Sequence, residues 1–193
     1  MKNRNTVIVA FLLAAVMILG VGYAAVTDTL DITGTLDAGA SSEIFNSHVK
    51  FVGVRNASGE YVTEYSADGL YTARVNADND DKASFTVSGL KVQGDTTTIT
   101  YKITNTSDLR AVITVRSATN SNASYFEVSY YVNDVDCATT PVVVTEGTEL
   151  GTIAPKTGEM TITVKVTLLH TPVENQSATT TFEFVASGEE THI

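Results

Sequence analysis

Apolar and polar residues alternate along most of this chain from residue 29 onward. The clearest run holds Ile99, Tyr101 and Ile103, with Thr and Lys at the positions between them. Residues 126–132 and 162–168 repeat the pattern with Phe, Val, Ile and Leu. A period of two places successive side chains on opposite faces of a strand, so these segments are predicted as half-buried antiparallel strands.

Clusters of Gly, Asn, Asp and Ser separate the strand-like segments, and no convincing helical pattern follows residue 29. Many short strands in one chain of this length favour an all-β fold, an antiparallel β-sandwich that is jelly-roll-like. We expect residues 39–193 to form this domain. The predicted strands are residues 29–38, 47–55, 61–65, 69–76, 83–93, 96–105, 110–118, 124–133, 140–145, 160–169 and 178–186.

Two segments of the chain have similar sequences, which fits this organisation. GDTTTITYKIT (94–104) resembles GEMTITVKVT (158–167), since each opens with Gly and an acidic residue and runs into an alternating strand. The two segments are therefore predicted to be strands in equivalent positions. The polar stretch 105–109 after the first of them is predicted to be a turn.

The N-terminus has the pattern of a secretory signal helix. Thirteen residues without a charge, 7–19, follow Lys2 and Arg4. A cut after Ala24 would place Gly22 at position −3, whereas a cut after Ala25 would place bulky Tyr23 there. We expect residues 1–24 to be a cleaved signal peptide and the chain to be secreted. The alternative is an uncleaved anchor, because the apolar run to Val26 is just long enough to span a bilayer.

The negative net charge limits the kinds of partner that this chain can bind. The chain has 22 acidic and 12 basic residues, and its formal charge is −10. Such a surface repels nucleic acid, so no nucleic-acid partner is expected. Contact with a membrane is expected only through an uncleaved signal segment. The hydrophobic content of 43% supports a real core without disulfides, which a single cysteine could not form internally.

No catalytic constellation is visible in the sequence. The histidines His48, His170 and His192 are far apart, and neither HExxH nor GxSxG occurs. The first two are expected at strand ends, with a metal ligand as the alternative reading. Cys137 has no CxxC partner and is predicted to be an inert thiol. No catalytic residue and no cofactor is therefore predicted.

An acidic run is a weak candidate for a metal site. Asp78, Asp80 and Asp81 supply three carboxylates within four residues, a composition that could bind calcium. An EF-hand loop beginning at Asp78 would need Gly at its sixth position, which is Ala83. We expect a solvated acidic turn.

The segment that follows the predicted cleavage site is a candidate for assembly. Residues 25–38 form an extended run that carries Thr27, Leu30, Ile32 and Leu36. An extended segment can add a strand to a neighbouring sheet, and head-to-tail repetition of that contact makes an open filament. The alternative is an ordinary edge strand of a monomer.

Three blocks of the sequence resemble the TasA/camelysin family of Gram-positive bacteria. They are GVGYAAVTDTL (20–30), residues 83–115, and SATTTFEFVAS (177–187). Family members carry an L-x-P-G-D turn, for which this chain has residues 90–95 with Val-Gln in place of the single proline. A strand ending in N-x-G-S/T follows in the family, and Asn105–Thr106–Ser107 stand in its place here.

The resemblance implies a jelly-roll protein of the cell surface or biofilm matrix, exported through a SipW-type signal peptidase. It implies fibres built by donation of the N-terminal strand, with copies of itself or other matrix proteins as partners. Camelysin-like members are casein-cleaving metallopeptidases, which is the second hypothesis. The third is a monomeric surface-binding or adhesion module that uses aromatic residues such as Tyr61, Tyr65 and Tyr71.

Overall fold

The computed structural model of the chain describes residues 30–40, 45, 47–76, 82–172 and 176–188. Nearly all regular structure in this part of the chain is β. The strands are β1 (Leu30–Ala40), β2 (Val49–Arg55), β3 (Tyr61–Val62), β4 (Glu64–Ala67), β5 (Tyr71–Val75), β6 (Lys82–Val87), β7 (Thr96–Asn105), β8 (Ala111–Asn120), β9 (Phe126–Val132), β10 (Glu149–Ile153), β11 (Gly158–Leu168) and β12 (Gln176–Gly188).

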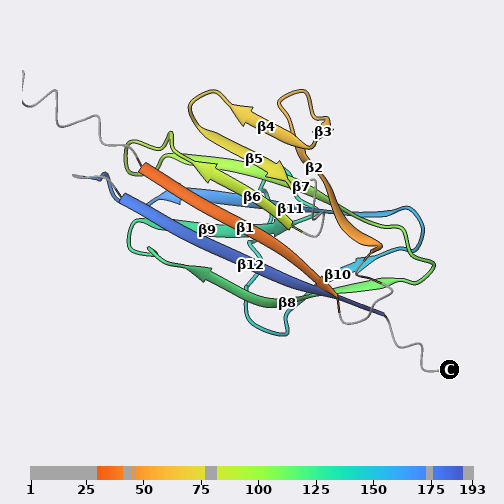
Figure 1. Cartoon of the computed structure of the whole chain (residues 1–193). Helices are drawn as coiled ribbons and strands as arrows, with labels where there is room; N and C mark the ends of the chain where they lie inside the picture. The colour runs from red at the N-terminus through yellow and green to blue at the C-terminus, as the bar shows by residue number, and fades with distance from the viewer. Residues whose placement is uncertain (1–29, 41–44, 46, 77–81, 173–175, 189–193) are drawn as a thin grey trace, which may run out of the picture.

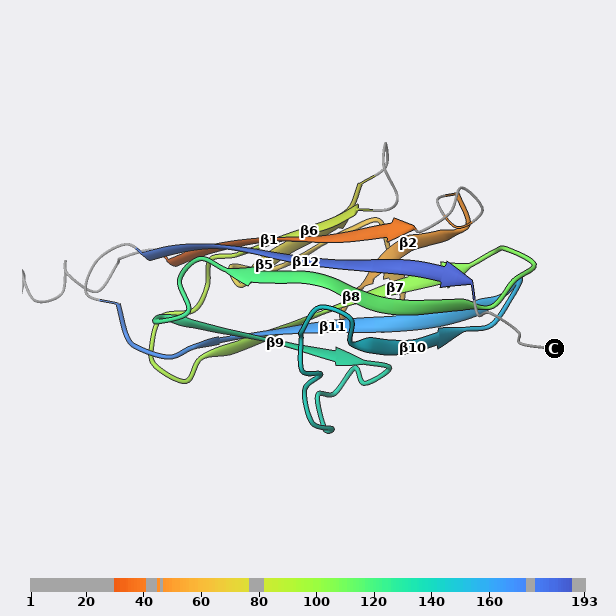
Figure 2. The same cartoon turned by 90° about the horizontal axis from the view of Figure 1, so that it is seen from below.

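The strands form two sheets. The seven-stranded sheet has the order β10-β8-β12-β1-β6-β5-β4, and the five-stranded sheet has the order β3-β2-β7-β11-β9. Every pairing is antiparallel except that of β1 with β12, which is parallel. The sheets lie as two layers in Figure 2, with β1, β6 and β12 in one layer and β9 and β11 in the other.

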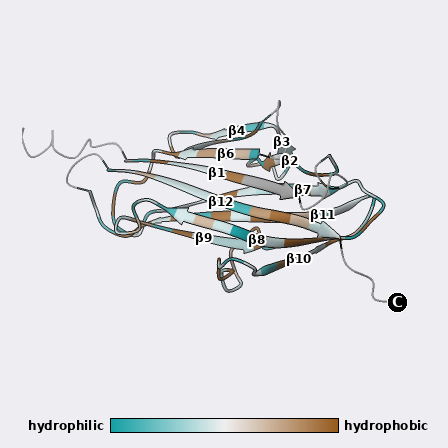
Figure 3. Cartoon of the chain, turned by 60° about the horizontal axis from the view of Figure 1, so that its bottom comes forward, coloured by the Kyte–Doolittle hydropathy of each residue, from teal (hydrophilic) through white to brown (hydrophobic). Residues whose placement is uncertain are grey.

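One hydrophobic core joins the two layers. The ring of Phe51 in β2 packs edge-on against Phe184 in β12, with 5.7 Å between centroids. Tyr130 in β9 stacks on Phe182 in β12 at 4.3 Å. Hydrophobic and hydrophilic positions alternate along strands such as β12, so each sheet turns its apolar face inward (Figure 3). The predicted all-β fold is therefore confirmed for the described residues, as two mostly antiparallel sheets that share one core.

Most strand predictions from the alternation are confirmed. The predicted strand 61–65 is split into β3 and β4 of different sheets, two further predictions are corrected, and one strand was missed. The predicted strand 83–93 ends at Val87, and the N–H groups of Ser88 and Gly89 that follow both bond the Leu70 carbonyl. Further on, Asp95 accepts hydrogen bonds from the N–H groups of Lys91 and Val92. Residues 140–145 form no strand, although the Val142 N–H bonds the Tyr130 carbonyl. Strand β10, interrupted by a bulge near Gly151, was not predicted.

The two segments of similar sequence, 94–104 and 158–167, lie in neighbouring strands. Strands β7 and β11 pair antiparallel from Thr96–Thr167 to Asn105–Gly158. The hydroxyls of Thr100 and Thr163 lie 2.9 Å apart on the outer face of this pair. The similar sequences therefore form two neighbouring inner strands of one sheet, where strands in equivalent positions were predicted.

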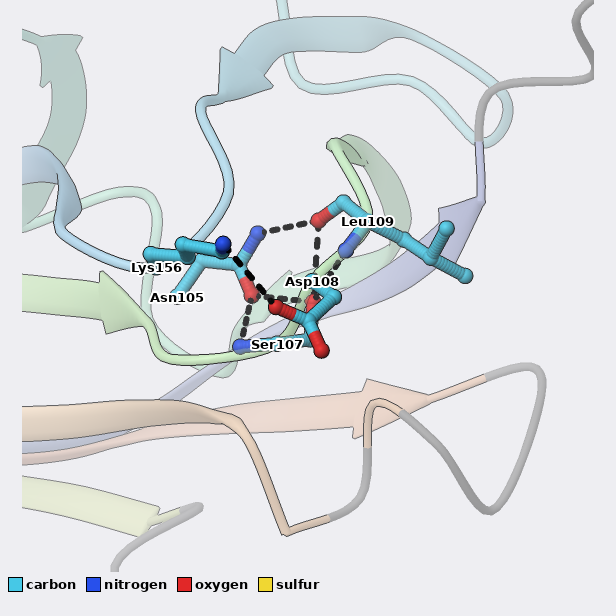
Figure 4. A network of polar contacts seen from close by, with 5 residues as sticks. All are labelled: Asn105, Ser107, Asp108, Leu109 and Lys156. Atoms are coloured by element: carbon cyan, nitrogen blue, oxygen red, sulfur yellow. Dashed lines mark hydrogen bonds and ion pairs between the residues drawn. The ribbon is translucent and has the colours of Figure 1, made fainter.

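The polar stretch after β7 is a turn built around Asn105, whose side chain is fully buried. Its Nδ2 donates to the carbonyl oxygens of Leu109, Ile153 and Ala154. Its Oδ1 accepts from the N–H and the hydroxyl of Ser107 (Figure 4). One amide thus ties the β7–β8 turn to the chain that follows β10.

Candidate functional site

The candidate assembly segment lies in the middle of the seven-stranded sheet. Strand β1 has β12 on one edge and β6 on the other, so both of its edges are occupied (Figure 1). Its neighbours come from the C-terminal strand and from the centre of the chain. The first described strand therefore closes a gap between two parts of the fold that follow it.

The pairing of β1 is long on both sides. With β12 it runs in parallel register from Leu30–Gln176 to Ala40–Ala186. With β6 it runs antiparallel from Ile32 opposite Val87. Ile32 and Leu36 are both 0% exposed and complete the core from this strand. Each such side chain contributes about 1.5–3 kcal/mol when it is buried, so β1 is needed for a filled core.

The inner face of β1 has a notch at Gly34, which the ring of Phe85 fills. Gly34 lies between Ile32 and Leu36 and pairs directly with Phe85 of β6. A Cβ atom at Gly34 would lie 2.0 Å from Cζ of the Phe85 ring, which is itself buried. The aromatic ring therefore occupies the space that a side chain at position 34 would need.

The outer face of β1 is polar. Asp31, Thr33 and Thr35 are exposed on it, beside exposed Thr179 of β12 and Thr86 of β6. The strand thus presents an apolar face to the core and hydroxyls to solvent.

The parallel pairing sets the direction of the chain ends. Because β1 and β12 run the same way, Leu30 lies at one end of the sandwich and Gly188 at the other (Figure 1). Strand β12 has 13 residues, so these two positions are about 40 Å apart.

Of the predicted assembly residues, Leu30, Ile32 and Leu36 lie in β1, which continues two residues beyond the predicted limit of 38 to Ala40. Thr27 lies outside the described residues, as do the predicted cleavage residues Gly22, Ala24 and Ala25. No pattern in the sequence indicated which strands would flank this segment.

The structure separates the two described histidines. His48 lies beside Thr106, with 3.0 Å between Nδ1 and Oγ1, near the Gly158 end of β11. His170 follows the other end of β11 and packs edge-on against Tyr125 at 6.2 Å. Since β11 has 11 residues, about 33 Å of strand separates them. They cannot ligate the same metal ion.

The other metal candidates are not brought together in the described part of the chain. Asp78, Asp80 and Asp81 lie outside it, as does His192. Among the residues that the structure describes, no three His, Cys, Asp or Glu side chains form a group that could hold a metal ion. Within the same residues, no helix has the length and hydrophobicity that a membrane span requires.

Cys137 lies in the loop after β9, partly buried and with a φ of 53°. Burial raises the pKa of its thiol, as do the carboxylates of Asp134 and Asp136, against the lowering effect of Lys165. The thiol is therefore mainly protonated at neutral pH, which keeps its reactivity low.

The same loop provides a pH-dependent contact. The Asp134 carboxylate accepts hydrogen bonds from the hydroxyl and the N–H of Thr139, both at 2.7 Å, and these bonds lower its pKa from 3.8 to about 2. Because the pKa is lowered, the ionised carboxylate stabilises the folded loop at any pH above the ordinary pKa of 3.8. This stabilisation is lost as the pH falls through about 2. We expect the Thr139 amide proton resonance to titrate with a midpoint near pH 2 in NMR spectra. In Asp134→Asn this titration should be absent; its persistence would contradict the assignment.

Comparison with known proteins adds little to this geometry. No family model matches the chain, and no curated protein matches it. A solved structure, the yeast delta-COP-I mu-homology domain, aligns with 82% of this chain and 98% of its own, at 8% sequence identity and a TM-score of 0.16. A similarity this low carries no argument about fold or function, so the candidate site stands on its own geometry.

Proposed function

We propose that this chain is a secreted structural subunit that polymerises head to tail at the bacterial cell surface or in a biofilm matrix. In this proposal the chain is exported by a SipW-type signal peptidase that cuts after Ala24, as its resemblance to the TasA/camelysin family implies. Each subunit donates β1 to the gap between β6 and β12 of the next. Its sandwich is of the jelly-roll type.

The observation that carries the proposal is the central position of β1. A strand with two occupied edges, a buried apolar face and a fitted notch contributes much to the fold, yet it is the first described segment of the chain. Exchange of such an element between identical subunits preserves every contact, because the neighbour supplies the same side chains.

The direction of the strands also supports a linear polymer. Ala40 pairs with Ala186 near the Gly188 end of the sandwich, so a donated β1 would leave its subunit at that end and extend toward the next. Eight residues separate Ala40 from Val49 in the sequence and span roughly 30 Å when extended. Donation of β1 over this length, with β2 in its own sheet, would require Phe45, which lies in this stretch and is 2% exposed, to leave its place in the core.

A cysteine pair tests whether β1 sits in its own subunit or in the next. Thr33 and Thr86 are exposed and directly opposite each other in β1 and β6, a geometry in which a disulfide can form. In a Cys137→Ser background that begins at Ala25, Thr33→Cys/Thr86→Cys is assembled under reducing conditions and then oxidised. We expect a ladder of covalent multimers on a non-reducing gel.

The matched control is Ser66→Cys/Thr72→Cys in the same background, because Ser66 and Thr72 face each other in β4 and β5. This pair should give only monomers on the gel, with or without fibres. Fibres that yield monomers from the 33/86 pair as well would overturn strand donation. Oxidation of the 33/86 pair before assembly should trap β1 in its own subunit and prevent fibres in electron micrographs.

A further inference from the structure

Part of one edge of β7 has no strand partner among the described residues. The pairing of β2 with β7 ends where Val54 meets Tyr101, whereas β7 itself begins at Thr96. On its other edge, β7 is paired with β11 over its whole length. No strand in the described part of the chain pairs with Thr96–Thr100 on the β2 side. Main-chain groups on a strand edge of this kind are available to another extended segment.

A cavity of about 360 Å³ follows this edge. Threonines 96, 97, 98 and 100 of β7 form one wall, and the rings of Tyr65 and Tyr71 form part of its lining. The two rings pack edge-to-face with 6.0 Å between centroids, and both are partly exposed. Arg55 at the end of β2 also lines it. The cavity thus combines a free strand edge, an aromatic surface and one cation.

The charge of this cavity differs from that of the chain. The chain carries 22 acidic and 12 basic residues, yet none of the residues that line the cavity is Asp or Glu. Arg55 is exposed and forms no ion pair within the residues that the structure describes. The Arg55 guanidinium can therefore form an ion pair with a carboxylate of a ligand bound in this cavity.

We propose that this cavity binds an extended, acidic peptide segment of a partner protein, which adds as a short strand to Thr96–Thr100 of β7. The peptide main chain pairs with the free edge, as in other cases of β-strand addition. One of its carboxylates pairs with Arg55, and an aliphatic side chain packs on Tyr65 and Tyr71. This inference is independent of the donation of β1, which concerns the other sheet.

The binding can be tested with a defined probe, the blocked pentapeptide acetyl-Val-Asp-Val-Asp-Val-amide, titrated into ¹⁵N-labelled protein that begins at Ala25. To keep the protein monomeric, β1 is fixed with the oxidised 33/86 cysteine pair. We expect the amide resonances of Thr96–Thr100 to shift in a saturable manner. The same peptide with N-methylated central residues cannot donate main-chain hydrogen bonds and should leave them unchanged. Equal shifts with both peptides, or no shifts at millimolar peptide, would overturn the proposal.

The contribution of Arg55 is tested with Arg55→Gln, which keeps a polar side chain without the charge. An exposed ion pair of this kind changes affinity roughly threefold to fivefold, so we expect that loss for the acidic probe. Arg116→Gln, an exposed arginine on β8, is the control and should bind as the parent does. A probe in which Lys replaces both Asp should bind less tightly to the parent. Binding of tri-galacturonate at these amides with no binding of the peptide would assign the cavity to an acidic saccharide and refute the peptide proposal.

Discussion

Replacing Asn105 with alanine is expected to lower the free energy of unfolding by about 3–4 kcal/mol. The Asn105 side chain is fully buried, and its amide satisfies three carbonyl oxygens and two donors of Ser107. Alanine would remove this partner from the carbonyls of Ile153 and Ala154 and from the Ser107 N–H, whereas the Leu109 carbonyl would keep its bond from the Ser107 hydroxyl. Chemical denaturation followed by circular dichroism measures the loss.

The variant Asn105→Asp tests the same contacts, because it keeps the shape of the side chain and replaces only the donor group Nδ2 with an oxygen. At pH 7 a carboxylate oxygen would face the carbonyls of Leu109, Ile153 and Ala154, so we expect a larger loss than with alanine. This arrangement raises the pKa of the new carboxyl in the folded state, and its protonation restores a donor. The deficit of Asn105→Asp relative to Asn105→Ala should therefore shrink as pH falls from 7 toward 4.

Asn122→Ala is the matched control, because Asn122 is only partly buried and its Nδ2 bonds Gln176 and Ser177 near the surface. We expect a loss of about 1 kcal/mol or less. Equal losses at Asn105 and Asn122 would show that the buried network contributes nothing beyond an ordinary surface contact.

The second large effect is expected at Gly34. A methyl group there meets the buried ring of Phe85, with 2.0 Å between the Cβ position and Cζ. Overpacking of this kind costs about 1–3 kcal/mol, and Gly34→Val should cost more than Gly34→Ala. The measurement is again the free energy of unfolding. Gly188→Ala is the control, since its Cβ would lie 3.5 Å from Phe45, an ordinary contact, and should be nearly neutral.

A double-mutant cycle separates this contact from general damage to the strand. Phe85→Leu shortens the side chain that fills the notch, so Gly34→Ala should cost much less in that background than in the parent. Additive losses would mean that glycine is needed for another reason. If β1 is donated between subunits, the same cycle holds across the interface. Subunits with Gly34→Ala should then copolymerise better with Phe85→Leu subunits than with the parent.

The sequence predicted the individual strands well where the alternation is strong. The strand predicted at 96–105 begins and ends at the residues where β7 does. The prediction failed at 140–145, where consecutive apolar residues pair with no neighbouring strand, and at β10, where Gly interrupts the alternation. Leu90, within the predicted strand 83–93, is buried although it lies beyond the end of β6 at Val87. Burial and strand pairing are separate properties, and the alternation reports only the first.

The candidate site was predicted in part. The run of Leu30, Ile32 and Leu36 identified an N-terminal strand with one apolar face, and β1 places Ile32 and Leu36 in the core. That β1 would lie between β6 and β12, and parallel to β12, was not foreseen. The free edge of β7 was equally hidden, because it depends on where β2 ends relative to β7 and not on any residue type in β7.

The sequence alone therefore determined that this chain folds into strands with one apolar face each, because side-chain alternation is a local property of an extended backbone. Only the tertiary structure decided which strands are neighbours and which edges stay open. Main-chain hydrogen bonds are the same for every pair of strands, so they do not select a partner. The selection comes from side-chain shape across the core, as where Phe85 fills the space above Gly34. Such complementarity appears only when the whole core is packed.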